Sequence, residues 1–491
     1  MEDKLYPKEI PNWIDGRQVL SSSGKVFDKI NPAIGKKISR VTRSDFKDID
    51  EAVKAGKKSQ PQWAEIPPVQ RGMILHDIVK AMQNRLEDIA GVVAIETGKS
   101  FNDACGETRG AIELGFFYAS EGQRLYGRTS TSGVKDKFSM TIRQPLGVAG
   151  LIIAANTPIA NIAWKVFPAL ICGNSVVVKS SEDTPITSWI FGEIAHNVGL
   201  LKGVLNIVQG IGEEAGKPLV AHPDVNIISF TGSAGVGREI ASVAGSRMAR
   251  VSLELGGKNP LVVCDDADLD NAVKWTILSG FSNAGQRCAS AARIIIFESV
   301  YDKFRKMLLT QSEKLSVGPD NEDDLGPVIN EKQLKNMLEC VSRAAVNGAE
   351  ILTGGKRLTD AKHSGGFYMA PTIIENIKPD DEISTTELFG PIICLYRAKN
   401  FNEALFLANN SRYGLTASIH TNSFHRAINF TQKVEAGVAV VNAGTYGSEP
   451  HMPFGGVKQS GNGWREPGTE ALDVYSSLKD IYLNTDITKT L

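Results

Sequence analysis

Residues 148–255 decide the fold, because five short apolar runs follow one another here with helical patterns between them. The runs are VAGLIIAA (148–155), SVVVK (175–179), VLNIV (204–208), VNIISF (225–230) and RVSLEL (250–255). Continuous Val and Ile are typical of strands that are buried on both faces of a parallel sheet. The intervening helices should begin near Thr184, Gly212 and Gly235. This βαβ pattern predicts a doubly wound, dinucleotide-binding sheet, a variant of the Rossmann fold.

A second series of apolar runs follows the pair Gly256–Gly257. It consists of PLVVC (260–264), RIIIF (293–297), PIICLY (391–396) and GVAVVN (437–442), again with helical patterns between them. We therefore expect a two-lobed α/β protein, and the cleft between two lobes is a favoured place for a ligand.

Three further segments complete the expected organisation. Residues 70–99 have the apolar periodicity of one long amphipathic helix, residues 124–145 resemble a polar hairpin, and residues 472–485 form a strand-like run. Exposed strands are usually paired or covered, and pairing between subunits is one solution, so we expect a homodimer or homotetramer. We expect a dinucleotide-binding domain over residues 1–123 and 146–256, a second α/β domain over 257–457, and a small β oligomerisation element with the C-terminal tail over 124–145 and 458–491.

Bulk composition excludes several classes of function. The net charge of −1, with 42% hydrophobic and 22% charged residues, gives no reason to expect a nucleic acid or a membrane as partner. The N-terminus has no basic and apolar signal pattern. Six cysteines stand singly and the seven histidines form no HExxH motif, so we expect no metal site. Unpaired thiols suit a reducing compartment, and the cytoplasm is the default expectation.

Cys288 is the cysteine whose surroundings favour chemistry. A lone cysteine is more often an inert core residue, but Cys288 stands among small residues in FSNAGQRCAS, directly after Arg287. Small neighbours let a substrate approach the sulfur, and a nearby positive charge favours the nucleophilic thiolate.

Two polar residues at strand ends are candidates to assist Cys288. Glu254 ends a buried run in LELGGKNP, and its carboxylate could act as a general base or could merely cap a turn. Asn156 follows another buried run and precedes Pro158. Its amide could stabilise a developing oxyanion, although an Asn that only makes a turn is equally compatible with the spacing.

Two glycine-rich turns could face a phosphate. GIGEEA (210–215), which contains Gly212, matches G-x-G-x-x-A, and SFTGSAGVG (229–237) contains Gly232 and Ser233 at another strand-to-helix turn. Each pattern alone is weak, and the two glutamates of the first would lie beside a pyrophosphate.

Taken together, these segments resemble the aldehyde dehydrogenase superfamily over nearly the whole chain. Cys288 lies 34 residues after Glu254, as in that family. Five motifs stand in the family's order, namely SFTGS (229–233), LELGGKNP (253–260), FSNAGQRC (281–288), ELFGP (387–391) and PFGGVKQSG (453–461).

The resemblance implies oxidation of an aldehyde to the free acid with NAD(P)+. Cys288 would form a thiohemiacetal, Asn156 and the Cys288 amide would form the oxyanion hole, and Glu254 would activate the water that hydrolyses the thioester. Because relatives that transfer the acyl group to coenzyme A generally lack this glutamate, a hydrolytic enzyme is expected. Lys165 and Glu466 would belong to a proton relay. The cofactor would contact Lys179, Glu182, Gly232, Ser233, Glu387 and Phe389.

The resemblance leaves cofactor preference and substrate partly open. Glu182 favours NAD, since it would repel a 2′-phosphate, while Lys179 keeps NADP possible. SGNGWREPG (460–468) contains one extra residue, Trp464, which could displace Glu466. The same extra residue is similar to a branch that includes 2,5-dioxovalerate (α-ketoglutarate semialdehyde) dehydrogenases. In contrast, EPHMPFGG (449–456) is similar to the corresponding segment of dehydrogenases that act on aromatic aldehydes.

Two arginines of succinate semialdehyde dehydrogenases are replaced here by Trp164 and Ser282. A substrate carboxylate would therefore need another cation. The candidates are Arg109, Arg124, Arg287 and His451. A non-catalytic family member and a thioester-forming acyltransferase are the competing hypotheses, and both are disfavoured by the presence of Cys288 and Glu254.

Overall fold

The computed structural model describes residues 5–485, and its first lobe is built on a seven-stranded sheet. The strand order is β12-β11-β8-β9-β10-β2-β3, in which the first five strands are parallel and the last two antiparallel. These are β2 (Asn12–Ile14), β3 (Arg17–Val19), β8 (Val148–Ile152), β9 (Ser175–Lys179), β10 (Leu205–Val208), β11 (Val225–Gly232) and β12 (Arg250–Leu255). All five predicted runs lie in this sheet, which confirms the doubly wound fold.

Helices cover both faces of this sheet, so alternate strand residues enter two separate cores. Val177 and Val208 pack beneath α1, α7 and α8, while Val176 and Val178 pack against α2 to α6. Burial on both sides explains the continuous Val and Ile runs. The helices are α1 (Phe46–Glu65), α2 (Pro68–Asn84), α3 (Leu86–Thr97), α4 (Phe101–Glu121), α5 (Pro158–Ile171), α6 (Pro185–Asn197), α7 (Lys217–Ala221) and α8 (Ala234–Ser246).

Two helix predictions need correction. The expected single helix over residues 70–99 is two helices, because Arg85 leaves the helical conformation with φ −113° and ψ 24°. Its guanidinium contacts Asp88 and Glu193 instead. The helix expected at Gly212 begins as a π-helical turn, Gly212–Gly216, before the short α7.

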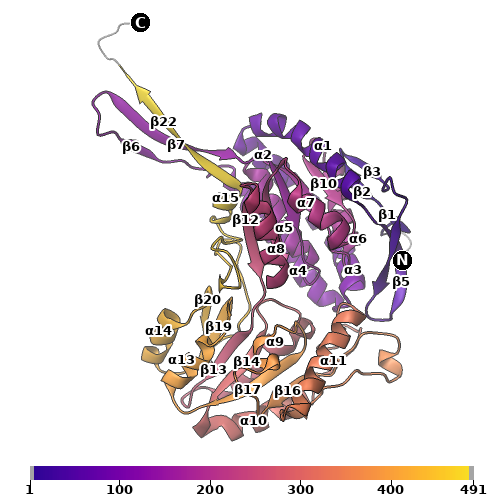
Figure 1. The fold of residues 1–491 in the computed structure, drawn as a ribbon, viewed down its shortest axis with the longest axis vertical. Coiled ribbons are helices and arrows are strands. Elements are labelled where there is room, and N and C mark those ends of the chain that lie inside the picture. Colours follow the sequence, from indigo (N-terminus) through magenta and orange to yellow (C-terminus); the bar gives the residue numbers. More distant parts are fainter. Residues whose placement is uncertain (1–4, 486–491) are drawn as a thin grey trace.

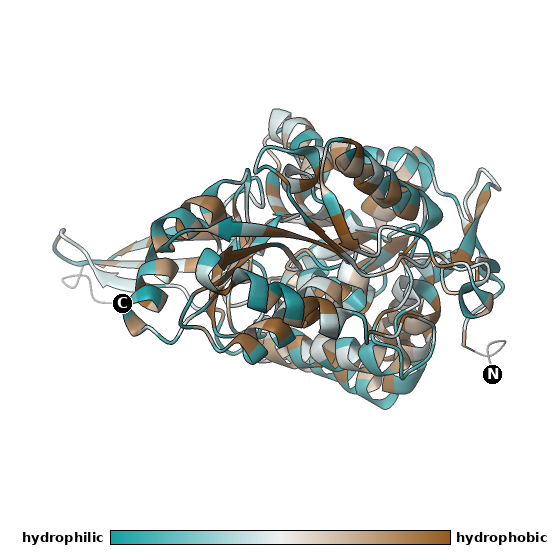
Figure 2. Cartoon of the chain, turned by 90° about the horizontal axis from the view of Figure 1, so that it is seen from below, coloured by the Kyte–Doolittle hydropathy of each residue, from teal (hydrophilic) through white to brown (hydrophobic). Residues whose placement is uncertain are grey.

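The second lobe contains another seven-stranded sheet, ordered β15-β16-β17-β14-β13-β19-β20 and parallel except for β15. Its strands are β13 (Asn259–Val263), β14 (Ala291–Phe297), β15 (Glu350–Thr353), β16 (Thr372–Glu375), β17 (Ile392–Ala398), β19 (Thr416–His420) and β20 (Val438–Val441). Around it lie α9 (Leu269–Phe281), α10 (Glu298–Ser312), α11 (Glu331–Val346), α12 (Glu382–Thr385), α13 (Phe401–Asn409) and α14 (Phe424–Lys433). In Figure 2 the strands that run through the middle of the molecule are largely brown, as expected for buried apolar sheets.

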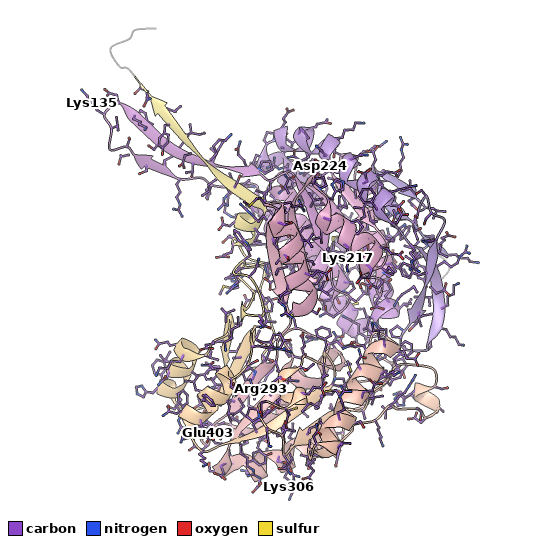
Figure 3. The ribbon with its side chains drawn as sticks, viewed as in Figure 1. Lys135, Lys217, Asp224, Arg293, Lys306 and Glu403 are labelled. Atoms are coloured by element: carbon purple, nitrogen blue, oxygen red, sulfur yellow. The ribbon has the colours of Figure 1, made fainter. Side chains whose placement is uncertain are left out.

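A three-stranded antiparallel sheet, β22-β7-β6, projects from the first lobe (Figure 1). It consists of β6 (Thr129–Thr131), β7 (Lys137–Pro145) and β22 (Ser476–Asn484), and Lys135 stands at its tip in Figure 3. The predicted hairpin is therefore present. The predicted strand over 472–485 is shorter, because residues 471–475 form helix α15 (Ala471–Tyr475), which packs into the core of the first lobe.

Smaller elements complete the described chain. Strands β1 (Glu9–Ile10), β4 (Val26–Asn31) and β5 (Lys36–Thr42) form one sheet, and β18 (Tyr413–Gly414) pairs with β21 (Val457–Lys458). Residues that follow β21 run between the lobes, where Gly461 pairs with Glu254. Over residues 5–485, no helix is long and apolar enough to cross a bilayer.

Candidate active site

A cavity of about 820 Å³ lies where the two lobes meet. Its walls include the segments that directly follow β8, β11 and β12, so it lies at the carboxyl ends of the central parallel strands. This is where doubly wound sheets bind ligands, at the point where the strand order reverses. Of the predicted site residues, those that line the cavity are Asn156, Gly232, Ser233, Glu254, Cys288, Glu387 and Phe389.

Cys288 reaches this cavity on a loop with an unusual backbone. Asn283, Ala284 and Gly285 all have positive φ, at 54°, 53° and 67°. A Cβ on Gly285 would come within 2.1 Å of the Gly390 carbonyl oxygen, so only glycine fits there. The loop thereby turns sharply from the end of α9 and presents Cys288 just before β14.

Two side chains that the sequence did not single out hold this loop. Asn259 donates from Nδ2 to the carbonyl oxygens of Cys288 and Ser290, both at 2.8 Å, and its Oδ1 accepts from the Thr416 amide at 3.0 Å. The Gln286 side chain donates to the Pro327 carbonyl oxygen and accepts from the Ile329 amide. A polar residue at the start of a buried strand, as in LELGGKNP, was the available signal for Asn259.

The electrostatic surroundings of Cys288 disfavour its thiolate. Burial, then the charges of Glu387 and Glu254, raise the pKa of the Cys288 thiol to about 12. The thiol is therefore protonated near neutral pH, and its attack requires a base or an added positive charge.

Glu254 is a buried carboxyl group without a hydrogen-bond partner in the described chain. It ends β12, is 3% exposed, and neither carboxyl oxygen receives a hydrogen bond. Burial, and then the charge of Glu466, raise the pKa of Glu254 well above its ordinary value. Gly455 leaves room for it, since a Cβ there would lie 2.8 Å from Oε1 of Glu254. An unpaired, desolvated carboxyl group beside a thiol has the properties of a general base.

Asn156 is also held at the cavity. Its Nδ2 donates to the Gln286 carbonyl oxygen at 3.0 Å, and its own carbonyl oxygen accepts from Lys99 at 2.8 Å. Lys99 in turn forms a buried ion pair with Glu107 at 2.7 Å, and Glu107 accepts from the Ile159 amide at the start of α5. An amide nitrogen carries two hydrogens, so one N–H of Asn156 is still available to a substrate oxygen.

Lys165 and Glu466 lie behind the cavity, not on its wall. Both are fully buried and form an ion pair of 3.0 Å. Ser229, Ser252 and Tyr475 also donate to the Glu466 carboxylate. The extra residue Trp464 therefore does not separate Glu466 from Lys165; its ring instead packs beside Arg250, 5.3 Å from the guanidinium.

Lys179 and Glu182, the residues expected at the adenosine ribose of a dinucleotide, do not line the cavity, whereas Asp183, the next residue in the chain, does. Lys179, at the end of β9, forms an ion pair of 2.8 Å with Glu182. Partial desolvation opposes the ionised form of Glu182, but the Lys179 charge and the Gly212 amide favour it, so its pKa is lowered overall. The Gly212 amide thus contacts the Glu182 carboxylate. Gly212 itself does not line the cavity. Gly232 and Ser233, at the start of α8, supply backbone N–H groups of the kind that bind phosphate.

Glu387 and Phe389 stand at the opposite wall. Glu387 accepts from the Gly257 amide at 3.1 Å, and burial raises its pKa to about 7. A Cβ on Gly256 would lie 1.7 Å from the Glu387 carboxylate, so glycine is required for this approach. Phe389 has φ 54° and lines the cavity. A buried carboxylate that retains an acceptor oxygen suits a ribose hydroxyl.

Comparisons with known proteins agree with this geometry. Residues 19–481 match the model of the aldehyde dehydrogenase family. The chain is 36% identical over 475 residues to an alpha-ketoglutaric semialdehyde dehydrogenase of Bacillus subtilis (strain 168), covering 96% of this chain and 97% of the relative. It is 35% identical to an alpha-ketoglutarate semialdehyde dehydrogenase of Haloferax volcanii, covering 96% and 98%.

A similar solved structure is betaine aldehyde dehydrogenase of Staphylococcus aureus in complex with NAD+. Its TM-score is 0.95 at 31% sequence identity, covering 97% of this chain and 95% of that one. Sequence, fold and the placement of a thiol, a carboxyl group and an amide around one cavity lead to the same conclusion: the chain belongs to the aldehyde dehydrogenase family.

Proposed function

We propose that this NAD(P)-dependent aldehyde dehydrogenase uses Cys288 as its nucleophile and Glu254 as the base that completes the reaction. The observation that carries the proposal is that the Cys288 thiol and the unpaired, buried carboxyl group of Glu254 line the same cavity as Asn156. No other described cysteine lines that cavity.

In the first half of the reaction, the Cys288 thiol releases its proton to solvent water, and its sulfur adds to the aldehyde carbon to form a thiohemiacetal. The carbonyl oxygen becomes an oxyanion, which the second N–H of Asn156 and the Cys288 amide are proposed to stabilise. One hydrogen-bond donor of this kind is commonly worth about 3–4 kcal/mol. Bound nicotinamide supplies the acceptor for the hydride that leaves the same carbon.

The second half of the reaction hydrolyses the resulting thioester. Glu254 takes a proton from water as the water oxygen attacks the acyl carbon, and the carbon–sulfur bond breaks to release a carboxylic acid. The raised pKa of Glu254 suits this role, because it makes the carboxylate a stronger base than an ordinary glutamate. Lys165 and Glu466 are proposed to pass that proton onward, and the support is that they form a fully buried ion pair of 3.0 Å behind the cavity. The product is the free acid and not an acyl-coenzyme A.

The cofactor preference is proposed to favour NAD over NADP. Glu182 is ionised beside Lys179, so it can accept from a ribose hydroxyl and would repel a 2′-phosphate.

The substrate is proposed to be an aldehyde that carries a carboxylate, because two relatives act on alpha-ketoglutarate semialdehyde by name. The alternative is an aromatic aldehyde, which the edge-to-face pair of Trp164 and Phe454 at 5.3 Å supports.

Assembly and location are proposed on structural grounds. One face of the projecting sheet is apolar, because Met140 opposes Ile481 and Phe138 opposes Leu483 across the strands. Phe138 is 61% and Leu483 47% exposed within one chain, which suits contact with another subunit in a homodimer or homotetramer. All six cysteines are free, which suits the reducing cytoplasm.

The test is steady-state reduction of cofactor, followed at the NADH absorbance band, with aliphatic, aromatic and carboxylate-bearing aldehydes. We expect turnover with NAD above that with NADP, free acid as product even with coenzyme A present, and loss of turnover in Cys288→Ala. Cys105→Ala, which removes a buried thiol outside the cavity, is the matched control. Turnover that survives Cys288→Ala would contradict the proposal.

A further inference from the structure

Arg287 is the one cation on the cavity wall, within the described chain, whose charge is not already neutralised. Lys99 and Arg287 are the basic residues of that wall. The Lys99 ammonium is held by Glu107 and by the Asn156 carbonyl oxygen. Arg287 has neither a carboxylate within ion-pair distance nor a hydrogen bond from its guanidinium in residues 5–485.

The Arg287 side chain is fixed by an aromatic platform. Its guanidinium lies 4.6 Å from the centroid of the Tyr446 ring, and that ring packs edge-to-face with Trp275 at 6.3 Å. Stacking on an aromatic face leaves the edge of a guanidinium free to donate hydrogen bonds.

The platform is tied to the nucleophile loop itself. Thr445, next to Tyr446, donates from Oγ1 to the Ala289 carbonyl oxygen at 2.6 Å, and its amide donates to the Ser279 hydroxyl at 3.2 Å. Arg287 and Ala289 flank Cys288 in the chain. The position of the cation relative to the sulfur is therefore set by the same short segment.

The other candidate cations are placed elsewhere. Arg109 is exposed on α4 and lies outside the cavity wall. Arg124 is paired with Glu121 beside the projecting sheet, and His451 is exposed, 3.6 Å from Glu449.

We propose that Arg287, held on Tyr446, binds the distal carboxylate of a semialdehyde substrate while Cys288 attacks its aldehyde group. The proposal rests on the proposed function and deepens it, because it selects an aldehyde that carries a carboxylate over a neutral or aromatic one. Trp164 and Phe454 lie beside Cys288 on the cavity wall and provide an apolar surface for the methylene chain. Of the acidic residues that line the cavity, Asp103, Glu113 and Glu449 are exposed, so water and salt screen their repulsion. Glu107 is paired with Lys99, and burial raises the pKa of Glu254 and Glu387, which reduces their negative charge.

The experiment compares 5-oxopentanoate with pentanal, two aldehydes of equal chain length that differ in the terminal carboxylate. In Arg287→Met the ratio of kcat/KM for 5-oxopentanoate to that for pentanal should fall about 10- to 100-fold. Arg287→Lys should lower the ratio less, because it keeps the charge but loses the planar fork. Tyr446→Ala should lower it and Tyr446→Phe should preserve it. Arg109→Met is the matched control and should leave the ratio unchanged.

A binding measurement separates this proposal from the proposed function. Calorimetric titration with glutarate, which carries no aldehyde, should show binding that weakens about tenfold or more in Arg287→Met. Pentanal oxidation without glutarate binding, or an unchanged ratio in Arg287→Met, would overturn the carboxylate site while leaving the aldehyde chemistry intact. Absence of all turnover with glutarate binding retained would contradict the proposed function and support the site.

Discussion

At the scale of single residues, the cavity combines a thiol with two carboxyl groups that repel its ionised form. Burial and the charges of Glu387 and Glu254 raise the pKa of Cys288, and burial raises the pKa of both carboxyl groups. The Cys288 thiol is therefore protonated near neutral pH, and a thiol reacts more slowly than a thiolate with oxidants and alkylating agents. A positive charge that enters the cavity would favour the thiolate, which links reactivity to the loaded state.

Glu387→Gln should speed the alkylation of Cys288 by iodoacetamide severalfold at about pH 8. Removal of this negative charge lowers the pKa of the thiol and raises the thiolate fraction. At lower pH the difference in alkylation rate between the variant and the wild type should become smaller. Below the pKa of about 7 of Glu387, the wild-type carboxyl group is already neutral, so the substitution removes no charge. The rate is followed by mass spectrometry of the Cys288 peptide in enzyme free of cofactor.

The matched control for this variant is Glu403→Gln. Glu403 lies on the outer side of the second lobe, where Figure 3 labels it, and accepts from the Lys399 amide. It should leave the alkylation rate unchanged. Equal alkylation rates for Glu387→Gln and the wild type at about pH 8 would show that Glu387 does not act on the thiol.

At the scale of elements, the site depends on strand ends and on one strained loop. The segment after β8 supplies Asn156 and the end of β12 supplies Glu254, while Asn259, the first residue of β13, fastens the loop that carries Cys288. Three consecutive residues, Asn283 to Gly285, have positive φ, and hydrogen bonds between Asn283 and Gln286 hold this turn.

Asn259→Ala should lower kcat/KM about 10- to 100-fold, because a displacement of the nucleophile near 1 Å costs roughly that much. It leaves the carbonyl oxygens of Cys288 and Ser290 and the Thr416 amide without their partner. Turnover and the thermal unfolding midpoint are measured together. Loss of activity with the midpoint retained, and a changed alkylation rate of Cys288, would indicate positioning; unchanged kcat/KM would contradict the role of Asn259.

The sequence predicts the central strands well because burial on both faces leaves a continuous apolar run, as in SVVVK. The sequence misses strands in which polar residues are buried through tertiary contacts. Strand β19, TASIH, is one of them: it is fully buried although Ser418 and His420 are polar, and Ser418 donates to the Ala443 carbonyl oxygen. The break at Arg85 is also missed, since apolar periodicity continues through it. Motifs identify Cys288, Glu254 and Asn156, but only the fold shows that Asn259 holds the loop and that Arg287 is unpaired.

At the scale of the whole molecule, two α/β lobes close one cavity and a projecting sheet extends from the first (Figure 1). The lobes meet at Gly256 and Gly257, where the chain passes from β12 of the first sheet to β13 of the second. This short segment therefore belongs to both lobes. Glu254 of the first lobe and Cys288 of the second, the two proposed catalytic groups, therefore lie in lobes that a short connection joins.

The double variant Phe138→Asp/Leu483→Asp should have a smaller mass in solution than the proposed homodimer or homotetramer, because it places charges opposite one another on the apolar face of the projecting sheet. Light scattering at micromolar concentration measures the mass. Tyr482→Asp, on the opposite face of β22, is the control and should leave the mass unchanged. A wild-type protein that is already monomeric would contradict the proposed assembly.

The most direct test of the account is the mass of Glu254→Gln enzyme quenched after mixing with NAD+ and an aldehyde that the wild type oxidises. Loss of the proposed base should slow thioester hydrolysis about 10²- to 10⁴-fold and leave hydride transfer possible, so acyl-enzyme should accumulate. One acyl group on the Cys288 peptide is expected, together with a burst of NADH of about one per active site. NADH formed with no adduct at Cys288, or steady turnover at the wild-type rate, would contradict it.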